Sequence, residues 1–111
     1  MRPLAENRLD EARQHCEEAL KIQSQLLDRN PELYLPDVAM TLSNLGSLDL
    51  QQNKLDDARQ HYEKALTSYR QLEQQHPGKY VRDVNETASI LKSLDRNNTG
   101  SNDPALGIAT P

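Results

Sequence analysis

The chain has 111 residues, enough for one small domain, and only 35% of them are hydrophobic, with no Phe and no Trp. A thick aromatic core is therefore excluded. The net charge is −4, with 13 basic and 17 acidic residues interspersed, which argues against nucleic acid as a partner. Leu supplies 17 of the 23 Leu, Ile and Val residues and nine Ala accompany them, a composition that favours helices over strands. We expect a thin, all-α fold.

Apolar residues never form a long uninterrupted stretch. No run approaches the roughly 20 residues needed to cross a bilayer, and no apolar signal segment follows the first residues. The single cysteine, Cys16, excludes an internal disulfide and a zinc site of several cysteines. These observations predict a cytoplasmic protein with no membrane contact.

The first predicted helix spans residues 5–29. Its apolar positions recur every three or four residues, which is typical of one stripe on a helix, and they are Leu9, Ala12, Cys16, Ala19, Leu20 and Leu26. Asn30 and Pro31 are predicted to end the helix, because the residue before a proline disfavours helical geometry.

A shorter second helix is predicted over residues 36–52. Pro36 and Asp37 suit a first helical turn, and the apolar positions are Val38, Leu42, Leu45 and Leu48. Asn53 tolerates the left-handed conformation, so we expect a tight turn there.

A long third helix, residues 54–76, and a short fourth, 82–95, complete the predicted order. The stripe of the third helix is Leu55, Ala58, Tyr62, Ala65, Leu66, Tyr69 and Leu72. His76, Pro77 and Gly78 end it. From Arg96 the composition turns to Asn, Thr, Gly, Ser, Asp and Pro, so residues 96–111 are predicted to be a flexible tail after one helical domain, 1–95.

An internal repeat of 46 residues relates the two halves of that domain. Residues 4–49 aligned with 50–95 give 23 identities in 46 positions. A period of this length is the signature of a repeat architecture. The predicted fold is therefore two units of antiparallel helical hairpins, a fragment of an α-solenoid.

The spacing of small and large residues resembles the tetratricopeptide repeat. The pattern consists of Leu42, Asn44, Leu45, Gly46, Ala58, Tyr62, Ala65, Leu66 and Pro77. Gly46 and Ala58 would let the two helices of a hairpin approach closely, with Tyr62 and Leu45 filling the wider part of the interface. The 46-residue period exceeds the 34 of the consensus repeat, which is similar to the longer repeats of the kinesin light chain type.

Two positions depart from the family pattern. Asp49 stands where the family usually has an aromatic residue, and Lys92 stands where the second unit should have glycine. The fourth helix therefore resembles a terminal cap.

The residues give no support for catalysis. No serine–histidine–aspartate arrangement or phosphate-binding loop can be assembled from the spacing, and we expect no enzyme activity, cofactor or metal site. His15 and His61 are equivalent in the two units and are predicted to face solvent, while His76 is predicted at a helix end. Cys16 replaces Tyr62 on the apolar stripe; a buried, inert thiol is favoured, and a reactive one stays open.

The resemblance implies a scaffold that binds a peptide or partner protein along the concave face of the shorter helices. Asn44 resembles an asparagine that holds a peptide backbone through its amide, although it could equally be a plain exposed polar residue. The positions implied as binding residues are Met40, Ser43, Asn44, Ser47, Gln51, Glu86, Ser89 and Ser93.

Self-association is the alternative function. The first helix is expected to lack its hairpin partner, which would leave one side of its stripe open. Two copies could cover that side by packing their first helices together as a homodimer, with Leu9, Cys16 and Leu20 at the contact. A segment of an enzyme chain that recruits substrate cannot be separated from the scaffold by these residues.

Overall fold

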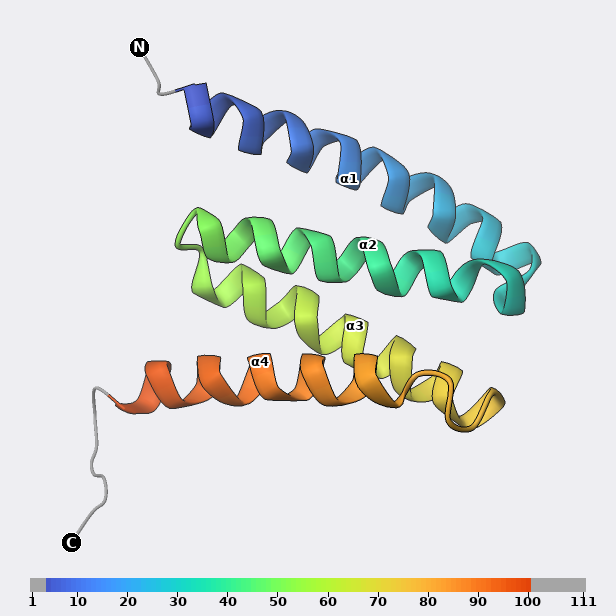
Figure 1. The fold of residues 1–111 in the computed structure, drawn as a ribbon. Coiled ribbons are helices and arrows are strands. Elements are labelled where there is room, and N and C mark those ends of the chain that lie inside the picture. Colours follow the sequence, from blue (N-terminus) through green and yellow to red (C-terminus); the bar gives the residue numbers. More distant parts are fainter. Residues whose placement is uncertain (1–3, 101–111) are drawn as a thin grey trace, which may run out of the picture.

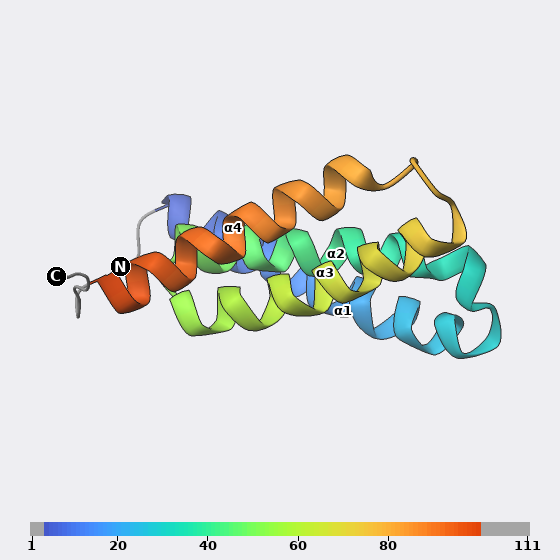
Figure 2. The same cartoon turned by 90° about the horizontal axis from the view of Figure 1, so that it is seen from below.

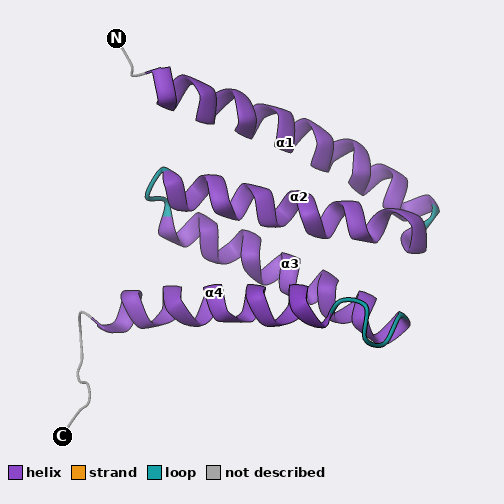
Figure 3. Cartoon of the chain, in the orientation of Figure 1, coloured by secondary structure: helices purple, strands orange, loops and turns teal. Residues whose placement is uncertain are grey.

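The computed structural model describes residues 4–100, with side chains given for residues 6–95. Over this range the chain forms four helices and no strand: α1 (Leu4–Arg29), α2 (Pro31–Gln51), α3 (Leu55–Gln75) and α4 (Val81–Gly100) (Figures 1 and 3). Each helix packs mainly against the next one in the sequence, as adjacent antiparallel pairs. Consequently α1 and α4 form the two edges of the molecule, and the predicted all-α hairpin fold is confirmed.

The turn between α1 and α2 is much shorter than predicted. Asn30 caps α2, its Oδ1 accepting from the backbone N–H of Leu33 at 3.3 Å, and Pro31 takes the first helical position, where a missing N–H costs nothing. The predicted start at Pro36 is therefore wrong. Pro36 lies inside α2, where it removes the bond to the carbonyl of Glu32, an exposed residue, and its ring crowds that carbonyl.

This longer α2 also removes the predicted alternation of long and short helices. Helices α2 and α3 have 21 residues each. Burial decides the outcome, because Leu35, just before Pro36, is only 6% exposed and its packing outweighs the extended conformation that a following proline favours.

The other turns follow the sequence more closely. Asn53 adopts a φ of 59°, which confirms the predicted left-handed turn. His76 caps the end of α3, its N–H bonding to the carbonyl of Leu72 at 2.8 Å. Beyond it, the Glu73 carboxylate accepts the N–H groups of Gly78 and Tyr80 at 2.5 and 2.7 Å.

Helix α4 runs past its predicted end at residue 95 as far as Gly100. It lies across α3 at an angle (Figure 2). The remainder of the predicted tail, residues 101–111, lies outside the described residues.

The core consists of two apolar clusters at different levels along the α2–α3 hairpin. The first contains the buried residues Leu35, Val38, Ala39, Leu42, Ala65, Tyr69 and Leu72. The second joins α3 to α4 through Ala58, Tyr62, Leu91 and Leu94. Most of the predicted hairpin stripe is buried, but Leu66 is only half-buried beside the second cluster and Leu55, in the first turn of α3, is exposed.

Gly46 lies against the aromatic ring of Tyr62 in the hairpin. A Cβ added at Gly46 would lie 2.7 Å from Cε2 of Tyr62, nearer than carbon atoms approach without a shift of the ring. The tyrosine is itself only 5% exposed. The absence of a side chain at position 46 thus makes room for the aromatic ring, as the sequence predicts.

Candidate functional site

The predicted peptide-binding positions of α2 lie on a part of the helix that the other helices leave partly uncovered. Met40 is 55% exposed, Asn44 and Gln51 are exposed, and Ser43 and Ser47 are half-buried. Met40, Asn44, Ser47 and Gln51 are spaced by four, three and four residues, which places them along one side of a helix.

Ser43 and Ser47 also have partners inside the protein. The hydroxyl of Tyr69 is hydrogen-bonded to Ser43, and that of Tyr62 to Ser47. Burial raises the pKa of both tyrosines, and the serine hydrogen bonds oppose that rise. These two serines therefore link the α2 surface to the rings of the hairpin core, a role that the sequence reasoning missed.

On α4 the predicted positions Glu86, Ser89 and Ser93 are all exposed. Ile90, at the place that Asn44 holds in α2, is partly buried against the second apolar cluster. The two helices therefore offer a repeated set of small and polar side chains, and the asparagine amide occurs only on α2 among these positions.

The least expected feature is a buried charge in the last turn of α2, where this helix meets α1 and α3. The Asp49 side chain is 0% exposed. Nη2 of Arg13, on α1, lies 2.6 Å from its Oδ1, and Nδ1 of His61, on α3, lies 2.5 Å from its Oδ2. A carboxylate can only accept, so Nδ1 of His61 carries the proton of that hydrogen bond.

Gln52 extends this cluster toward solvent. Its Oε1 accepts from Nη2 and Nε of Arg13 at 2.7 and 3.2 Å, and its Nε2 donates to Asp10 Oδ1 at 3.0 Å. Oδ1 of Asp49 therefore has an ion pair with Arg13 but no hydrogen bond. Three helices are thus held by one polar network around a desolvated carboxylate.

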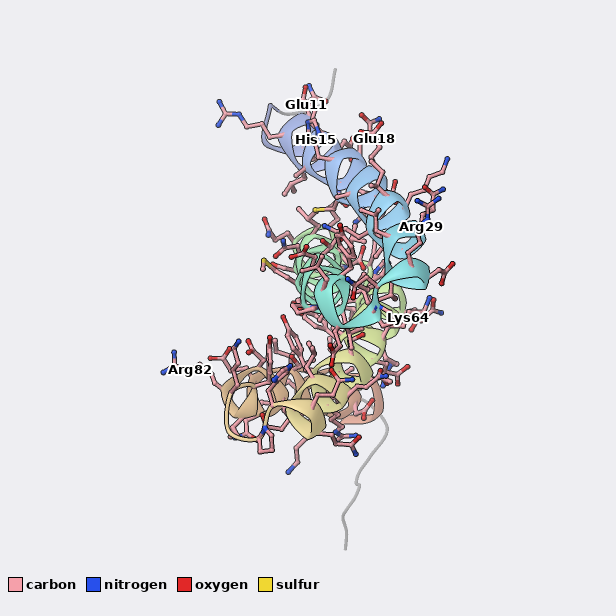
Figure 4. All side chains as sticks on the ribbon, turned by 90° about the vertical axis from the view of Figure 1, so that its right-hand side faces the viewer. Glu11, His15, Glu18, Arg29, Lys64 and Arg82 are labelled. Carbon is pink, nitrogen blue, oxygen red and sulfur yellow. The ribbon has the colours of Figure 1, made fainter. Side chains whose placement is uncertain are left out.

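His61 does not face solvent, and that prediction is wrong. Its ring is 25% exposed and bonded to Asp49, because the tight turn at Asn53 brings the first turns of α3 back over the end of α2. His15, its counterpart in α1, is exposed and lies with Glu11 and Glu18 along the outer side of α1 (Figure 4).

The repeat carried a signal for this network. Arg13 and Asp49 recur 46 residues later as Arg59 and Asp95, and the second pair also forms an ion pair, between α3 and α4. Asp95, however, is 61% exposed. Two signals in the sequence could have indicated an ion pair between helices. Arg and Asp recur at the same positions of both units, and Asp49 stands where the family usually has an aromatic residue.

The predicted self-association residues are all half-buried. Leu20 packs against the first apolar cluster, while Leu9 and Cys16 have intermediate exposure. Burial raises the pKa of the Cys16 thiol, Arg13 opposes the rise and Glu17 adds to it, so the thiolate is disfavoured.

Other kinds of site find little support in the described part of the chain. Its His, Cys, Asp and Glu residues form no group of three that could hold a metal ion. No helix in that part is long and apolar enough to span a membrane.

Comparison with known proteins gives one match. A family model described as the tetratricopeptide repeat matches residues 4–71. The chain matches no curated protein and no solved structure.

Proposed function

Because the chain belongs to the tetratricopeptide repeat family, whose repeats generally mediate protein–protein interactions, we propose that it is a non-catalytic module that binds a peptide or partner protein along α2 and α4. Asn44 carries this proposal. Its amide is exposed midway along α2 and forms no hydrogen bond with any other described residue. An amide can accept from and donate to one peptide unit at the same time.

The residues around Asn44 support the same face. Met40, one turn earlier, is 55% exposed, and a ligand that covers it removes apolar surface from water. Farther along α2 and on α4 the side chains are mostly small or polar. The proposed contact residues are Met40, Ser43, Asn44, Ser47, Gln51, Glu86, Ser89 and Ser93.

The charge of this face restricts the partner. The proposed contacts include Glu86 and no Lys or Arg, so a peptide with an acidic end would lack a counter-charge. An extended neutral or basic peptide fits better. We place the module in the cytoplasm, where a reducing environment suits the free Cys16, and assign its repeats to the long, kinesin light chain-like type because of the 46-residue period.

The test is selection from a random peptide library followed by measurement of affinity for the selected peptides. Asn44→Ala should weaken binding by about 1–3 kcal/mol, because the peptide loses two hydrogen bonds that are shielded from water in the complex. Amide chemical-shift changes in the wild-type chain should concentrate on α2 and α4.

Gln60→Ala is the matched control. Gln60 is exposed on α3, away from the proposed face, and its removal should leave affinity unchanged. His61→Ala is unsuitable because it would disturb the Asp49 network. Equal losses from Asn44→Ala and Gln60→Ala would place the binding surface elsewhere.

A further inference from the structure

The two edge helices present stripes that are equivalent to the two sides of the α2–α3 contact. Helix α2 meets α3 through residues spaced by four, three, four and three positions: Leu35, Ala39, Leu42, Gly46 and Asp49. Their counterparts on α4, 46 residues later, are Val81, Asn85, Ala88, Lys92 and Asp95. The α2 residues are all buried. Of their α4 counterparts, Ala88 is half-buried and the other four are exposed.

Helix α1 carries the complementary half of that contact. The α3 residues that face α2 include Ala58, His61, Tyr62, Ala65, Ser68 and Leu72, and their α1 counterparts are Ala12, His15, Cys16, Ala19, Ile22 and Leu26. Ser68 is buried in the hairpin, while Ile22 is 56% exposed. The open side of α1 therefore carries the positions that α3 uses to contact α2. The open side of α4 carries the positions that α2 uses to contact α3.

The two departures from the repeat compensate each other. In the hairpin, Gly46 leaves room for Tyr62. At the edges the glycine position holds Lys92 and the tyrosine position holds Cys16. If α1 packed on α4 as α3 packs on α2, the longer side chain of Lys92 would lie over the smaller Cys16, so the exchange of large and small keeps the interface volume nearly constant.

The charges of the two stripes also match. His15 and Asp95 stand where His61 and Asp49 make their hydrogen bond. Glu11 and Glu18 flank His15 on α1 (Figure 4), and Glu18 replaces Lys64 of α3. Glu11 and Glu18 thus offer counter-charges to Lys92 on α4.

We propose that copies of this chain stack head to tail, with α1 of one copy packed against α4 of the next as α3 packs against α2. The contact is heterologous, because it joins two different surfaces. It therefore generates a ring or an open chain of copies, unlike the two-fold dimer through paired first helices that the sequence suggests. It does not depend on the proposed peptide binding, since that face uses other residues of α2 and α4.

Cysteine cross-linking distinguishes these arrangements. In Lys92→Cys, stacking brings the new thiol of one copy beside Cys16 of its neighbour. Position 16 belongs to α1 and position 92 to α4, the two helices at opposite edges of a single chain (Figure 1), so no intramolecular disulfide competes. Mild oxidation should give a ladder of dimers, trimers and larger species, formed about tenfold or more faster than in a control that lacks the proximity.

The matched control is Gln60→Cys, which adds a thiol at another exposed position, on α3. Cross-linking at equal rates in both variants would overturn the proposal. Dimers from the wild-type chain, through its single Cys16, without a ladder from Lys92→Cys, would establish the two-fold arrangement instead.

Sedimentation equilibrium provides a second measurement. The wild-type average mass should rise above 12.6 kDa with concentration, and Lys92→Glu should weaken the association about tenfold or more by facing Glu11 and Glu18 of α1. Unchanged helicity by circular dichroism would show that the variant is folded. A wild-type monomer at all concentrations would contradict the stacking. A wild-type monomer that associates only in the double variant Leu106→Ser/Ile108→Ser would indicate that the last residues of its own chain cover the exposed stripe of α4. That result would also overturn the stacking proposal.

Discussion

The two Arg–Asp ion pairs between described helices occupy equivalent positions in the 46-residue repeat but differ in their exposure to solvent. Arg13 and Asp49 join α1 to α2, and Arg59 and Asp95 join α3 to α4 at the same register. Helix α3 covers the first pair and adds His61, so Asp49 is fully buried, while Asp95 remains 61% exposed. Burial by a third helix, and not the pair itself, makes the first one a structural element.

The largest predicted effect is the difference between Asp49→Ala and Asp95→Ala. Removing Asp49 takes the counter-charge from the largely buried Arg13 and the hydrogen-bond acceptor from the half-buried His61, and we expect a loss of about 3 kcal/mol or more in the free energy of unfolding. Removing Asp95 breaks a solvent-screened pair and should cost no more than about 1 kcal/mol. Urea denaturation followed by circular dichroism measures both. Equal losses would mean that burial does not separate the two pairs.

Gly46 and Lys92 offer a second comparison at equivalent positions. Gly46→Ala should destabilise the protein by about 1–2 kcal/mol, because the new Cβ meets the Tyr62 ring and this strain exceeds the gain in helix propensity. Lys92→Ala, at an exposed site, should change stability by no more than about 0.5 kcal/mol.

A Tyr62→Cys background tests the cause of the Gly46 effect. The smaller side chain copies the residue at Cys16 and should abolish the penalty of Gly46→Ala. If the penalty persists in that background, the ring is not its origin.

The smallest predicted effect is the pH dependence of stability that comes from Tyr62 and Tyr69. Both tyrosines belong to the α2–α3 hairpin and are hydrogen-bonded to serines of α2. Burial raises the pKa of Tyr62 and Tyr69 in the folded chain, so the unfolded state releases its tyrosine protons first as pH rises. Their contribution to stability is present below about pH 10, the ordinary tyrosine pKa, and is lost above it.

Replacement by phenylalanine measures this contribution. Tyr62→Phe/Tyr69→Phe should flatten the fall in the urea midpoint between neutral and strongly alkaline pH, and each substitution should cost about 1 kcal/mol at neutral pH through the lost serine hydrogen bond. An alkaline slope identical to that of the wild-type chain would contradict the assignment.

Much of the fold could be predicted because it depends on local patterns. Apolar spacing identified four helices, and the repeat identified which positions are equivalent. The contact between Gly46 and Tyr62 could be predicted because a glycine opposite a large aromatic residue in a helical hairpin makes room for the ring. Of the candidate site, the exposure of Met40 and Asn44 was predictable, whereas the hydrogen bonds of Ser43 and Ser47 to the tyrosines depend on how α2 and α3 are rotated against each other.

The sequence by itself determined the helical class, the 46-residue repeat and the left-handed turn at Asn53, because propensity and periodicity act within one element. Asn7, its equivalent in the first unit, lies inside α1, so even an identical residue takes its conformation from its setting. Only the tertiary structure decided that α2 begins at Pro31, that His61 turns inward and that Asp49 is sealed while Asp95 is not. Those outcomes depend on which helix covers a residue from another part of the chain, and an amphipathic pattern specifies the covered face without specifying its partner.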